Sequence, residues 1–195
     1  MIKRIFDFIS SFFFLLFFFP FFFLISILVR IDSKGPIFFT QIRVGKNSKD
    51  FLLLKYRTMR VAQENSSLIT VGNDSRITNI GNFLRKYKLD ELPQLINILK
   101  GDMSIVGPRP EVRKYVDMYS PAQLEVLTVK PGLTDPASIK FSNESELLGK
   151  AENPENYYIQ ELMPAKIELS LNYIRTQTFL TDLKIILKTF SKIFS

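Results

Sequence analysis

The feature that most constrains this chain is the stretch from Phe8 to Val29, which carries no charged residue and is dense in Phe, Leu and Ile. As a helix rising about 1.5 Å per residue, it is long enough to cross a hydrocarbon core of about 30 Å. It is longer than the apolar part of a cleavable signal peptide, and no small-residue cleavage site follows it. We therefore expect the N-terminus to lie in a membrane.

Pro20 sits near the middle of this stretch, where it removes a backbone hydrogen bond and clashes with the preceding turn, so a kink or break is expected. Basic residues flank both ends, with Lys3 and Arg4 before the stretch and Arg30 and Lys34 after it. Because positive charge favours the cytoplasmic side, these flanks favour a re-entrant segment with both ends on that side. A break, however, exposes carbonyl groups in lipid that must find partners. Composition alone leaves both interpretations open and slightly favours an ordinary kinked span.

The absence of Cys and His excludes several kinds of catalytic site. There can be no disulfide framework, no thiolate or imidazole metal site, and no Cys-His or Ser-His machinery. Catalysis must rest on carboxylates, hydroxyls, Lys or Arg, and any metal should be a hard, oxygen-bound cation such as Mg²⁺. The net charge of +7 favours an anionic partner, which could be nucleic acid, a nucleotide or an anionic membrane surface. The sequence carries no nucleic-acid-binding motif, Walker-type loop or Rossmann fingerprint.

The segment that follows the apolar stretch predicts a β-hairpin. The run from Ile37 to Arg43 is typical of a short strand, residues 45–48 of a turn, and the run from Phe51 to Tyr56 of a second strand. Lys55 and Arg57 lie at the far end of this hairpin. Two basic residues at a strand end are, in isolation, more often solvated than functional.

Beyond the hairpin, helix and turn signals alternate. They predict a loop at 73–76 with Asp74 as a turn former, a short helix through 83–87, a helix over 111–129 interrupted at Ser120-Pro121, a turn at 130–134, and an exposed loop or short helix over 142–156. From Pro164 onward we expect helix in at most two pieces.

The last of these helices is amphipathic. Its apolar residues recur at helical spacing, while its lysines fall largely on another face: Leu180, Leu183, Ile186, Leu187 and Phe190, against Lys184, Lys188 and Lys192. A helix packed on the core is the default interpretation. In a chain that already holds a membrane segment, a basic amphipathic helix could equally lie in the membrane interface.

Two adjacent carboxylates, Asp90 and Glu91, stand at an expected helix start. Asp90 suits the N-cap, Pro93 is tolerated in the first turn, and the helix should end near Gly101. On these residues alone, a cap for a helix and a functional acidic centre are equally good interpretations.

Basic residues surround this pair. Arg85 and Lys88 precede it, and Arg109 follows between two prolines in Gly107-Pro108-Arg109-Pro110. A helix start offers unpaired NH groups and a partial positive charge, so it can hold a phosphate beside carboxylates if a cation neutralises them. The pattern is that of an anion site with an acidic centre.

Taken in order, these pieces resemble the small monotopic phosphoglycosyl transferases of the bacterial sugar transferase family. The resemblance covers nearly the whole chain and is carried by Lys3-Arg4-Ile5-Phe6-Asp7, Gly35-Pro36-Ile37-Phe38-Phe39-Thr40-Gln41, Lys55-Tyr56-Arg57-Thr58-Met59, Leu89-Asp90-Glu91-Leu92-Pro93-Gln94-Leu95, Lys100-Gly101-Asp102-Met103-Ser104 and Gly107-Pro108-Arg109-Pro110. One such string would be weak evidence, whereas all of them in order are highly specific.

The resemblance implies transfer of a sugar 1-phosphate from a nucleotide sugar, usually a UDP-sugar, to a polyprenyl phosphate, with release of UMP. Asp90 would be the nucleophile that attacks the β-phosphate and forms an acyl-phosphate, and Glu91 would hold Mg²⁺. Four basic residues would contact the donor or line its pocket: Arg85, Arg109, Lys55 and Arg57. The chemistry agrees, because a carboxylate can attack a diphosphate only where cations neutralise the accumulating charge.

Two departures from the family pattern concern the membrane segment and the substrate contacts. The resemblance implies a re-entrant helix-break-helix, but Phe19 stands before Pro20 where many members have Ser. The family's late Arg, which helps to bind substrate, is matched here by Ser142, with Lys140 as the nearest basic candidate. The sugar preference therefore cannot be carried over.

These inferences predict an α/β, mainly helical protein with a re-entrant membrane helix over residues 1–30, broken near Pro20. A cytoplasmic catalytic domain with a small β-hairpin and an amphipathic C-terminal helix would follow over 31–195. We expect a UDP-sugar, polyprenyl (undecaprenyl) phosphate and membrane lipid as partners, and no nucleic acid, and we leave a homodimer open. The expected location is the cytoplasmic face of the bacterial inner membrane. The rival functions are a catalytically silent scaffold for glycan-assembly enzymes and a hydrolase of nucleotide sugars.

Overall fold

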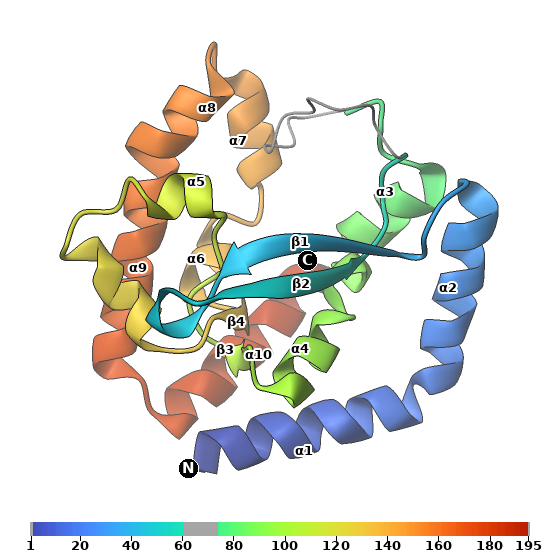
Figure 1. Ribbon diagram of the computed structural model, residues 1–195, viewed down its shortest axis with the longest axis horizontal. Helices are drawn as coiled ribbons and strands as arrows, with labels where there is room; N and C mark the ends of the chain where they lie inside the picture. Colours follow the sequence, from blue (N-terminus) through green and yellow to red (C-terminus); the bar gives the residue numbers. More distant parts are fainter. Residues whose placement is uncertain (1, 61–73, 195) are drawn as a thin grey trace.

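The computed structural model describes residues 2–60 and 74–194 of the chain. Its most conspicuous feature is a bent pair of N-terminal helices, α1 (Ile2–Phe17) and α2 (Phe19–Asp32), which frames one corner of the molecule (Figure 1). The two axes differ by 67°, and the break falls at Phe18. Pro20 lies in the first turn of α2, where a helix requires no NH donor, so it starts the second helix rather than disrupting it.

No single helix in the described part of the chain is both long and apolar enough to cross a membrane, although α1 and α2 together meet that requirement by length and composition. Polar contacts tie the pair to the rest of the fold. Arg4, in α1, donates to the carbonyl oxygens of Ile98 (2.5 Å) and Leu99 (3.0 Å). Near the break, the Tyr56 hydroxyl donates to the Phe22 carbonyl oxygen at 3.0 Å. These hydrogen bonds hold α1 against α4 and α2 against the hairpin.

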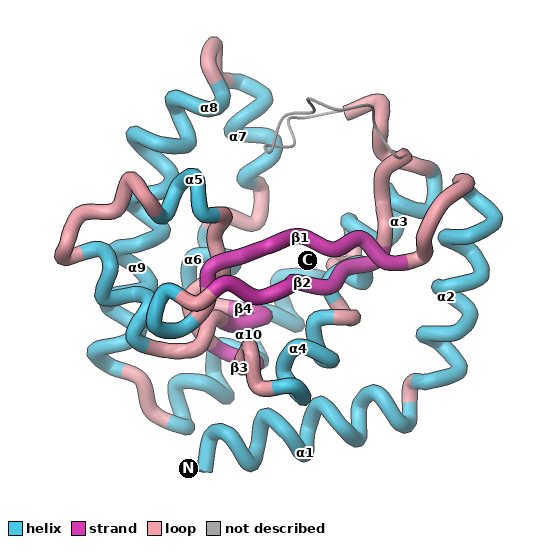
Figure 2. Tube along the Cα trace, viewed as in Figure 1, coloured by secondary structure: helices cyan, strands magenta, loops and turns pink. Residues whose placement is uncertain are grey.

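The predicted hairpin is confirmed. Strand β1 (Phe38–Val44) pairs antiparallel with β2 (Asp50–Tyr56), in a register that runs from Phe38 opposite Tyr56 to Val44 opposite Asp50. A short 3₁₀ turn, η1 (Lys46–Ser48), joins the strands. The two strands cross the middle of the molecule, above α1 and α4 in Figure 2.

Helix α3 (Asn79–Lys86) leads through a 3₁₀ turn, η2 (Leu89–Glu91), into α4 (Gln94–Lys100). The predicted helix end near Gly101 is confirmed, since Gly101 caps α4 with a φ of 94° that glycine adopts without strain. The predicted start is wrong: Asp90 lies inside η2, and Pro93 occupies the cap position of α4. Asp90 is therefore not held by a capping hydrogen bond.

A second, parallel strand pair lies beneath the hairpin: β3 (Ser104–Val106) pairs with β4 (Gly132–Thr134), where the sequence predicted only a turn. The pairing depends on Gly107 and Gly132, because a Cβ atom on Gly132 would lie 2.1 Å from the Gly107 nitrogen. Only glycine permits this approach, and residues 108–111 leave the strand pair from there.

The long helix expected over 111–129 is also wrong, because only α5 (Arg113–Val116) and the 3₁₀ segment η3 (Gln123–Thr128) form. The amide of Val44 donates to the Glu111 carbonyl oxygen at 2.9 Å, which holds the chain before α5 extended against the hairpin. Pro121 then separates α5 from η3, as the sequence indicated.

The C-terminal third is helical: α6 (Pro136–Lys140), α7 (Glu144–Lys150), α8 (Pro154–Tyr157), a π-helical turn η4 (Tyr158–Leu162), α9 (Met163–Thr176) and α10 (Phe179–Phe194). The two helices predicted from Pro164 onward are confirmed as α9 and α10, whereas α6 and η4 were not predicted. The default prediction of a core-packed apolar face on α10 is confirmed in part, because Ile185 is buried and Ile186 packs against the same core cluster. Its buried residues are Asp182 and Ile185, whereas Leu180, Leu187 and Phe190 are exposed. Part of the apolar stripe of α10 therefore lies on the surface of the protein.

Candidate active site

A polar cavity of about 520 Å³ gathers five of the six residues that the sequence singled out. Strand β2 contributes Lys55, α3 contributes Arg85, η2 contributes Asp90 and Glu91, and the loop after β3 contributes Arg109. Residues distant in the sequence thus converge on the carboxylate pair, as expected of an anion site.

Glu91 is the paired member of the two carboxylates. Its Oε1 accepts hydrogen bonds from Lys55 Nζ (2.9 Å) and Arg109 Nη2 (2.5 Å), and its Oε2 accepts from Arg109 Nη1 at 3.3 Å. Burial opposes ionisation of this carboxyl, but the charges and hydrogen bonds of Arg109 and Lys55 outweigh it and hold its pKa well below the usual range. Glu91 is therefore an anion at neutral pH.

Asp90 is the unpaired member. It is buried, with 8% of its surface exposed, and no group in the described part of the chain donates a hydrogen bond to its carboxylate. Burial and the negative charge of Glu91 raise its pKa, against the opposing charges of Lys55 and Arg85. A raised pKa marks a more basic carboxylate, and one without donors has its lone pairs free for an electrophile.

The backbone around Asp90 explains its position. Lys88 adopts a left-handed conformation (φ 55°, ψ 22°), which is uncommon for a residue other than glycine and turns the chain sharply between α3 and η2. The sharp turn directs the 3₁₀ segment into the cavity wall. Strained backbone of this kind is concentrated at functional sites.

Arg57, the sixth predicted residue, is not among the side chains that line this cavity. Its guanidinium donates to the carbonyl oxygens of Ser33 (2.6 Å), Lys34 (2.8 Å) and Val29 (3.4 Å), at the C-terminal end of α2. A cation at a helix C-terminus satisfies carbonyl groups that have no partner in the helix. In this structure Arg57 anchors the end of α2 to the hairpin.

Of the two candidates for the family's late Arg, Ser142 lines the cavity and Lys140 does not. Lys140 lies over the ring of Phe141, with its Nζ 5.5 Å from the ring centre. The position that corresponds to the late Arg therefore offers a hydroxyl here rather than a charge.

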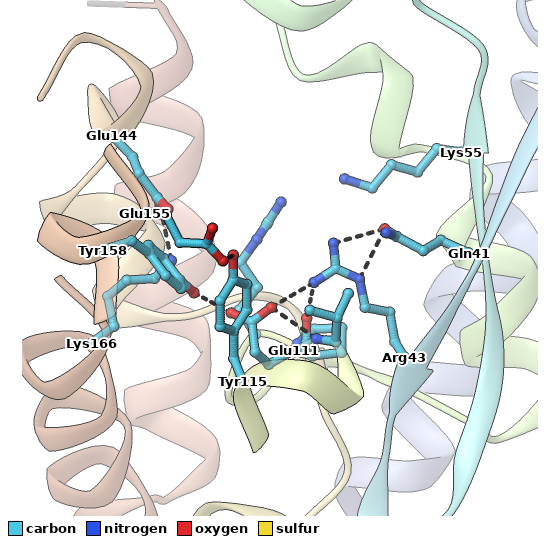
Figure 3. A network of polar contacts seen from close by, with 12 residues as sticks. Gln41, Arg43, Lys55, Glu111, Tyr115, Glu144, Glu155, Tyr158 and Lys166 are labelled. Atoms are coloured by element: carbon cyan, nitrogen blue, oxygen red, sulfur yellow. Dashed lines mark hydrogen bonds and ion pairs between the residues drawn. The ribbon is translucent and has the colours of Figure 1, made fainter. Parts of the chain in front are cut away.

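Sequence reasoning missed other charged and polar residues of this cavity, which Figure 3 shows from close by; some lie on the hairpin and others on the C-terminal helices. Arg43 in β1 donates to Glu111 Oε1 at 3.0 Å, and Tyr158 donates from its hydroxyl to Glu111 Oε2. Lys166, in α9, pairs with Glu144 at 2.9 Å. Glu111 directly follows the Pro-Arg-Pro string, which was the available signal, whereas Arg43, Tyr158 and Lys166 lie in segments that carried no motif.

The carboxylate pair fits Mg²⁺ on the chemistry of its donors. Mg²⁺ is usually held by one or two carboxylates together with substrate phosphates and water. Asp90 has free oxygens, and Glu91 Oε2 accepts only the longer bond from Arg109, so both retain capacity. No group of three or more metal-binding side chains was found in the described ranges, so substrate and water would have to complete the shell.

The arrangement suits chemistry on a phosphate. Lys55, Arg85, Lys88 and Arg109 supply positive charge around two carboxylates, only one of which has its charge balanced by direct contacts. A group that carries two or more phosphates could enter such a cavity, and the unpaired carboxylate could attack it.

Comparison with known proteins agrees with this chemistry. The model of the bacterial sugar transferase family matches residues 1–195. An uncharacterized sugar transferase of Bacillus subtilis (strain 168) is 35% identical, with 99% of this chain and 87% of the relative covered. A UDP-glucose:undecaprenyl-phosphate glucose-1-phosphate transferase of Escherichia coli (strain K12) is 36% identical over 98% of this chain.

A UDP-N-acetylgalactosamine-undecaprenyl-phosphate N-acetylgalactosaminephosphotransferase of Aeromonas hydrophila is 33% identical over 96% of this chain. This chain spans only 42% of the Aeromonas relative and 40% of the Escherichia coli one. The match over the whole of this chain is nevertheless decisive for its family. The chain belongs to the bacterial sugar transferases, and it is a transferase.

Proposed function

We propose that the protein transfers a sugar 1-phosphate from a UDP-sugar to a polyprenyl phosphate and releases UMP. The observation that carries this proposal is the buried, unpaired carboxylate of Asp90 beside the paired carboxylate of Glu91 in a cationic cavity. The relatives from Escherichia coli and Aeromonas, which are named as transferases that act on a UDP-sugar and undecaprenyl phosphate, support it.

In the first step, a carboxylate oxygen of Asp90 attacks the β-phosphorus of the UDP-sugar. A bond forms between that oxygen and phosphorus, the bond from the β-phosphorus to the bridging oxygen breaks, and UMP leaves with the electron pair. Arg109 and Lys55 stand beside the point of attack, where they neutralise charge on the phosphate oxygens. The product is an acyl-phosphate that links Asp90 to the sugar phosphate.

In the second step, a phosphate oxygen of the acceptor attacks the phosphorus of this acyl-phosphate. The phosphorus–Asp90 oxygen bond breaks, the carboxylate of Asp90 is regenerated, and a polyprenyl diphosphate sugar leaves. Such a lipid-linked sugar is the first membrane-committed intermediate of a glycan. Dividing the reaction in this way lets a water-soluble donor and a lipid acceptor use one site in turn.

A bound Mg²⁺ would supply neutralisation of phosphate charge during both steps. Glu91 would hold it through Oε2, while Lys55 and Arg109 keep the carboxylate oriented and ionised. Transfer should then fall in excess chelator and return when Mg²⁺ is added. Unchanged transfer in chelator would refute this role of Glu91.

We also propose that α1 and α2 enter the membrane from the cytoplasmic side and return to it. Their outward side chains support membrane contact, because a series of Phe residues there is exposed: Phe12, Phe13, Phe17, Phe19 and Phe23. Since UDP-sugars are cytoplasmic, the site and the end of α2 that leads to it lie on that side. The hydrogen bonds from Arg4 to the Ile98 and Leu99 carbonyl oxygens hold the start of α1 against the same body, which supports placing both ends there. Lys3→Cys creates a unique thiol, and an impermeant reagent should label it only after lysis. Labelling in intact cells would overturn the re-entrant arrangement and leave the catalytic proposal standing.

Incubation with a UDP-sugar labelled in its sugar, with and without polyprenyl phosphate, tests the activity. We expect a labelled lipid product only when the acceptor is present. Free labelled sugar phosphate formed at the same rate without acceptor would instead identify a hydrolase. No turnover of any UDP-sugar under either condition would favour the silent scaffold.

A further inference from the structure

A second cavity of about 480 Å³ adjoins the polar one and differs from it in character. The two cavities have seven lining residues in common: Lys86, Lys88, Glu91, Arg109, Ser142, Glu144 and Ser145. Beyond this junction the walls of the second cavity are largely apolar, and they include Leu92, Ile105, Leu133, Ile139, Ile186 and Phe190. An apolar chamber therefore opens directly onto the carboxylate pair.

Helix α10 forms one wall of this chamber and also part of the outer surface. Ile186, Phe190 and Ile193 line the chamber at helical spacing. Phe190 is 53% exposed, and Leu187 on the neighbouring face is 69% exposed. Apolar surface is thus continuous from the outside of α10 to the junction with the polar cavity.

The donor suits the polar cavity better than this chamber. A nucleoside diphosphate sugar carries charge and hydroxyl groups along its length, and burying these against apolar walls costs free energy unless they are hydrogen-bonded. The acceptor has the opposite distribution, because one phosphate ends a long hydrocarbon chain. A site that is cationic at the junction and apolar beyond it matches this distribution.

We propose that the chamber between β4, α6 and α10 receives the first isoprenoid units of the acceptor, with the acceptor's phosphate held at the junction by Arg109, Lys86 and Lys88. The proposal rests on the proposed function, because it assigns one substrate of that reaction to a place. It makes α10 part of the acceptor site: one face of the helix lines the chamber, and the neighbouring apolar face lies outside.

The test separates the two halves of the reaction in detergent micelles. The variants Phe190→Asn and Ile193→Asn each place a polar amide in the chamber wall, and Leu187→Asn is the matched control on the outer face of α10. Each protein is first incubated with UDP-sugar alone, and the amount of Asp90 adduct is measured by intact-protein mass spectrometry. Undecaprenyl phosphate or the short-chain geranyl phosphate is then added, and the discharge of the adduct is followed.

We expect all three variants to form the adduct as fast as the unmodified protein. Discharge by undecaprenyl phosphate should slow about tenfold in the two chamber variants, which is the effect of losing roughly one buried apolar contact, and should be unchanged in Leu187→Asn. The advantage of undecaprenyl over geranyl phosphate should shrink in the chamber variants only.

Normal discharge in both chamber variants would overturn the proposal. So would slower adduct formation with unchanged discharge, because the chamber would then serve the donor. Equal slowing by Leu187→Asn would point to general detergent or membrane contact of α10 and would also refute a dedicated chamber. If no adduct forms in the unmodified protein, the proposed function fails, and this result is distinguishable from all the others.

Discussion

A comparison of two buried polar clusters in the described part of the chain shows that their carboxylates are bound in opposite ways. In the cluster beneath α1, Asp7 accepts from the Ser104 hydroxyl (2.7 Å) and the Ile105 amide (3.1 Å). Asp182, in α10, accepts there from Lys3 (2.5 Å) and from the Tyr173 hydroxyl (2.6 Å). Every carboxylate oxygen in this cluster has a donor.

Of the adjacent carboxylate pair in the cavity, only Glu91 is satisfied in this way. Asp90 stands beside it without a donor, buried, and with a raised pKa. A buried carboxylate without a partner costs stability, and folds keep such groups where function requires them. The difference therefore separates a cluster that joins α1, β3 and α10 from one that holds a reactive group ready. Four variants test this distinction.

The largest effect should come from removing the reactive carboxylate. Asp90→Asn keeps the shape of the side chain but removes its nucleophilic oxygen, and we expect transfer to fall by at least about 10⁴-fold. The measurement is the rate of labelled lipid product at saturating substrates. Binding of the donor should survive, so loss of UDP-sugar binding in the same variant would show that Asp90 has a different role.

Removing the charge of Glu91, which is paired with Lys55 and Arg109, should reduce the transfer rate less than Asp90→Asn does but should lower the stability of the fold. Glu91→Gln leaves Lys55 and Arg109 without their anion, and we expect a loss of about 2 kcal/mol of unfolding free energy. Transfer should fall about 10- to 100-fold, with a higher Mg²⁺ requirement. Denaturant titration and a Mg²⁺ series measure the two effects. A variant as stable as the unmodified protein would contradict the pairing.

In the cluster beneath α1, the same kind of change should affect stability alone. Asp182→Asn removes the charge that Lys3 and Tyr173 contact, and we expect a loss of about 2 kcal/mol. Transfer per folded molecule should be unchanged. Glu155→Gln is the control, because the Glu155–Lys114 pair is exposed and its loss should be hardly measurable. A lower transfer rate per folded molecule in Asp182→Asn would contradict the purely structural role of this cluster.

The smallest expected effect is a gain in stability of Asp90→Asn at neutral pH, and the sign of this change tests whether Asp90 is unpaired. Because the folded-state pKa of Asp90 is raised, folding favours its protonated form, and ionisation destabilises the fold as the pH rises from the unfolded value of about 3.9 through the folded value. Asp90→Asn should therefore be more stable than the unmodified protein at neutral pH, and the gain should vanish in acid. Thermal unfolding across this range measures it. A variant less stable at neutral pH would mean that Asp90 has a partner after all.

The sequence predicted those parts of the fold and site that local patterns control. Strand alternation and a turn predicted the hairpin, Pro20 predicted the break, and the clustering of Arg85 and Arg109 with Asp90 and Glu91 predicted an anion site. Each of these features follows from a few consecutive residues or from a short sequence motif. The order of those strings also indicated the family.

The missed features depend on contacts between distant segments. The β3–β4 pair needs the mutual approach of Gly107 and Gly132, which no local pattern encodes. The role of Arg57 follows from where α2 ends in space, and Arg43 meets Glu111 only once the hairpin is placed. Asp90 is a residue type that favours a helix cap, but the left-handed turn at Lys88 precedes a 3₁₀ segment that contains Asp90, so it does not cap α4.

The most direct test of the central claim is to map the covalent intermediate. The protein should be incubated with UDP-sugar in the absence of acceptor, quenched in acid, digested and examined by mass spectrometry. We predict a sugar-phosphate adduct on the peptide that contains Asp90, located at Asp90, absent from Asp90→Asn and discharged by polyprenyl phosphate. An adduct on any other residue, or full transfer with no adduct at any time point, would contradict the account.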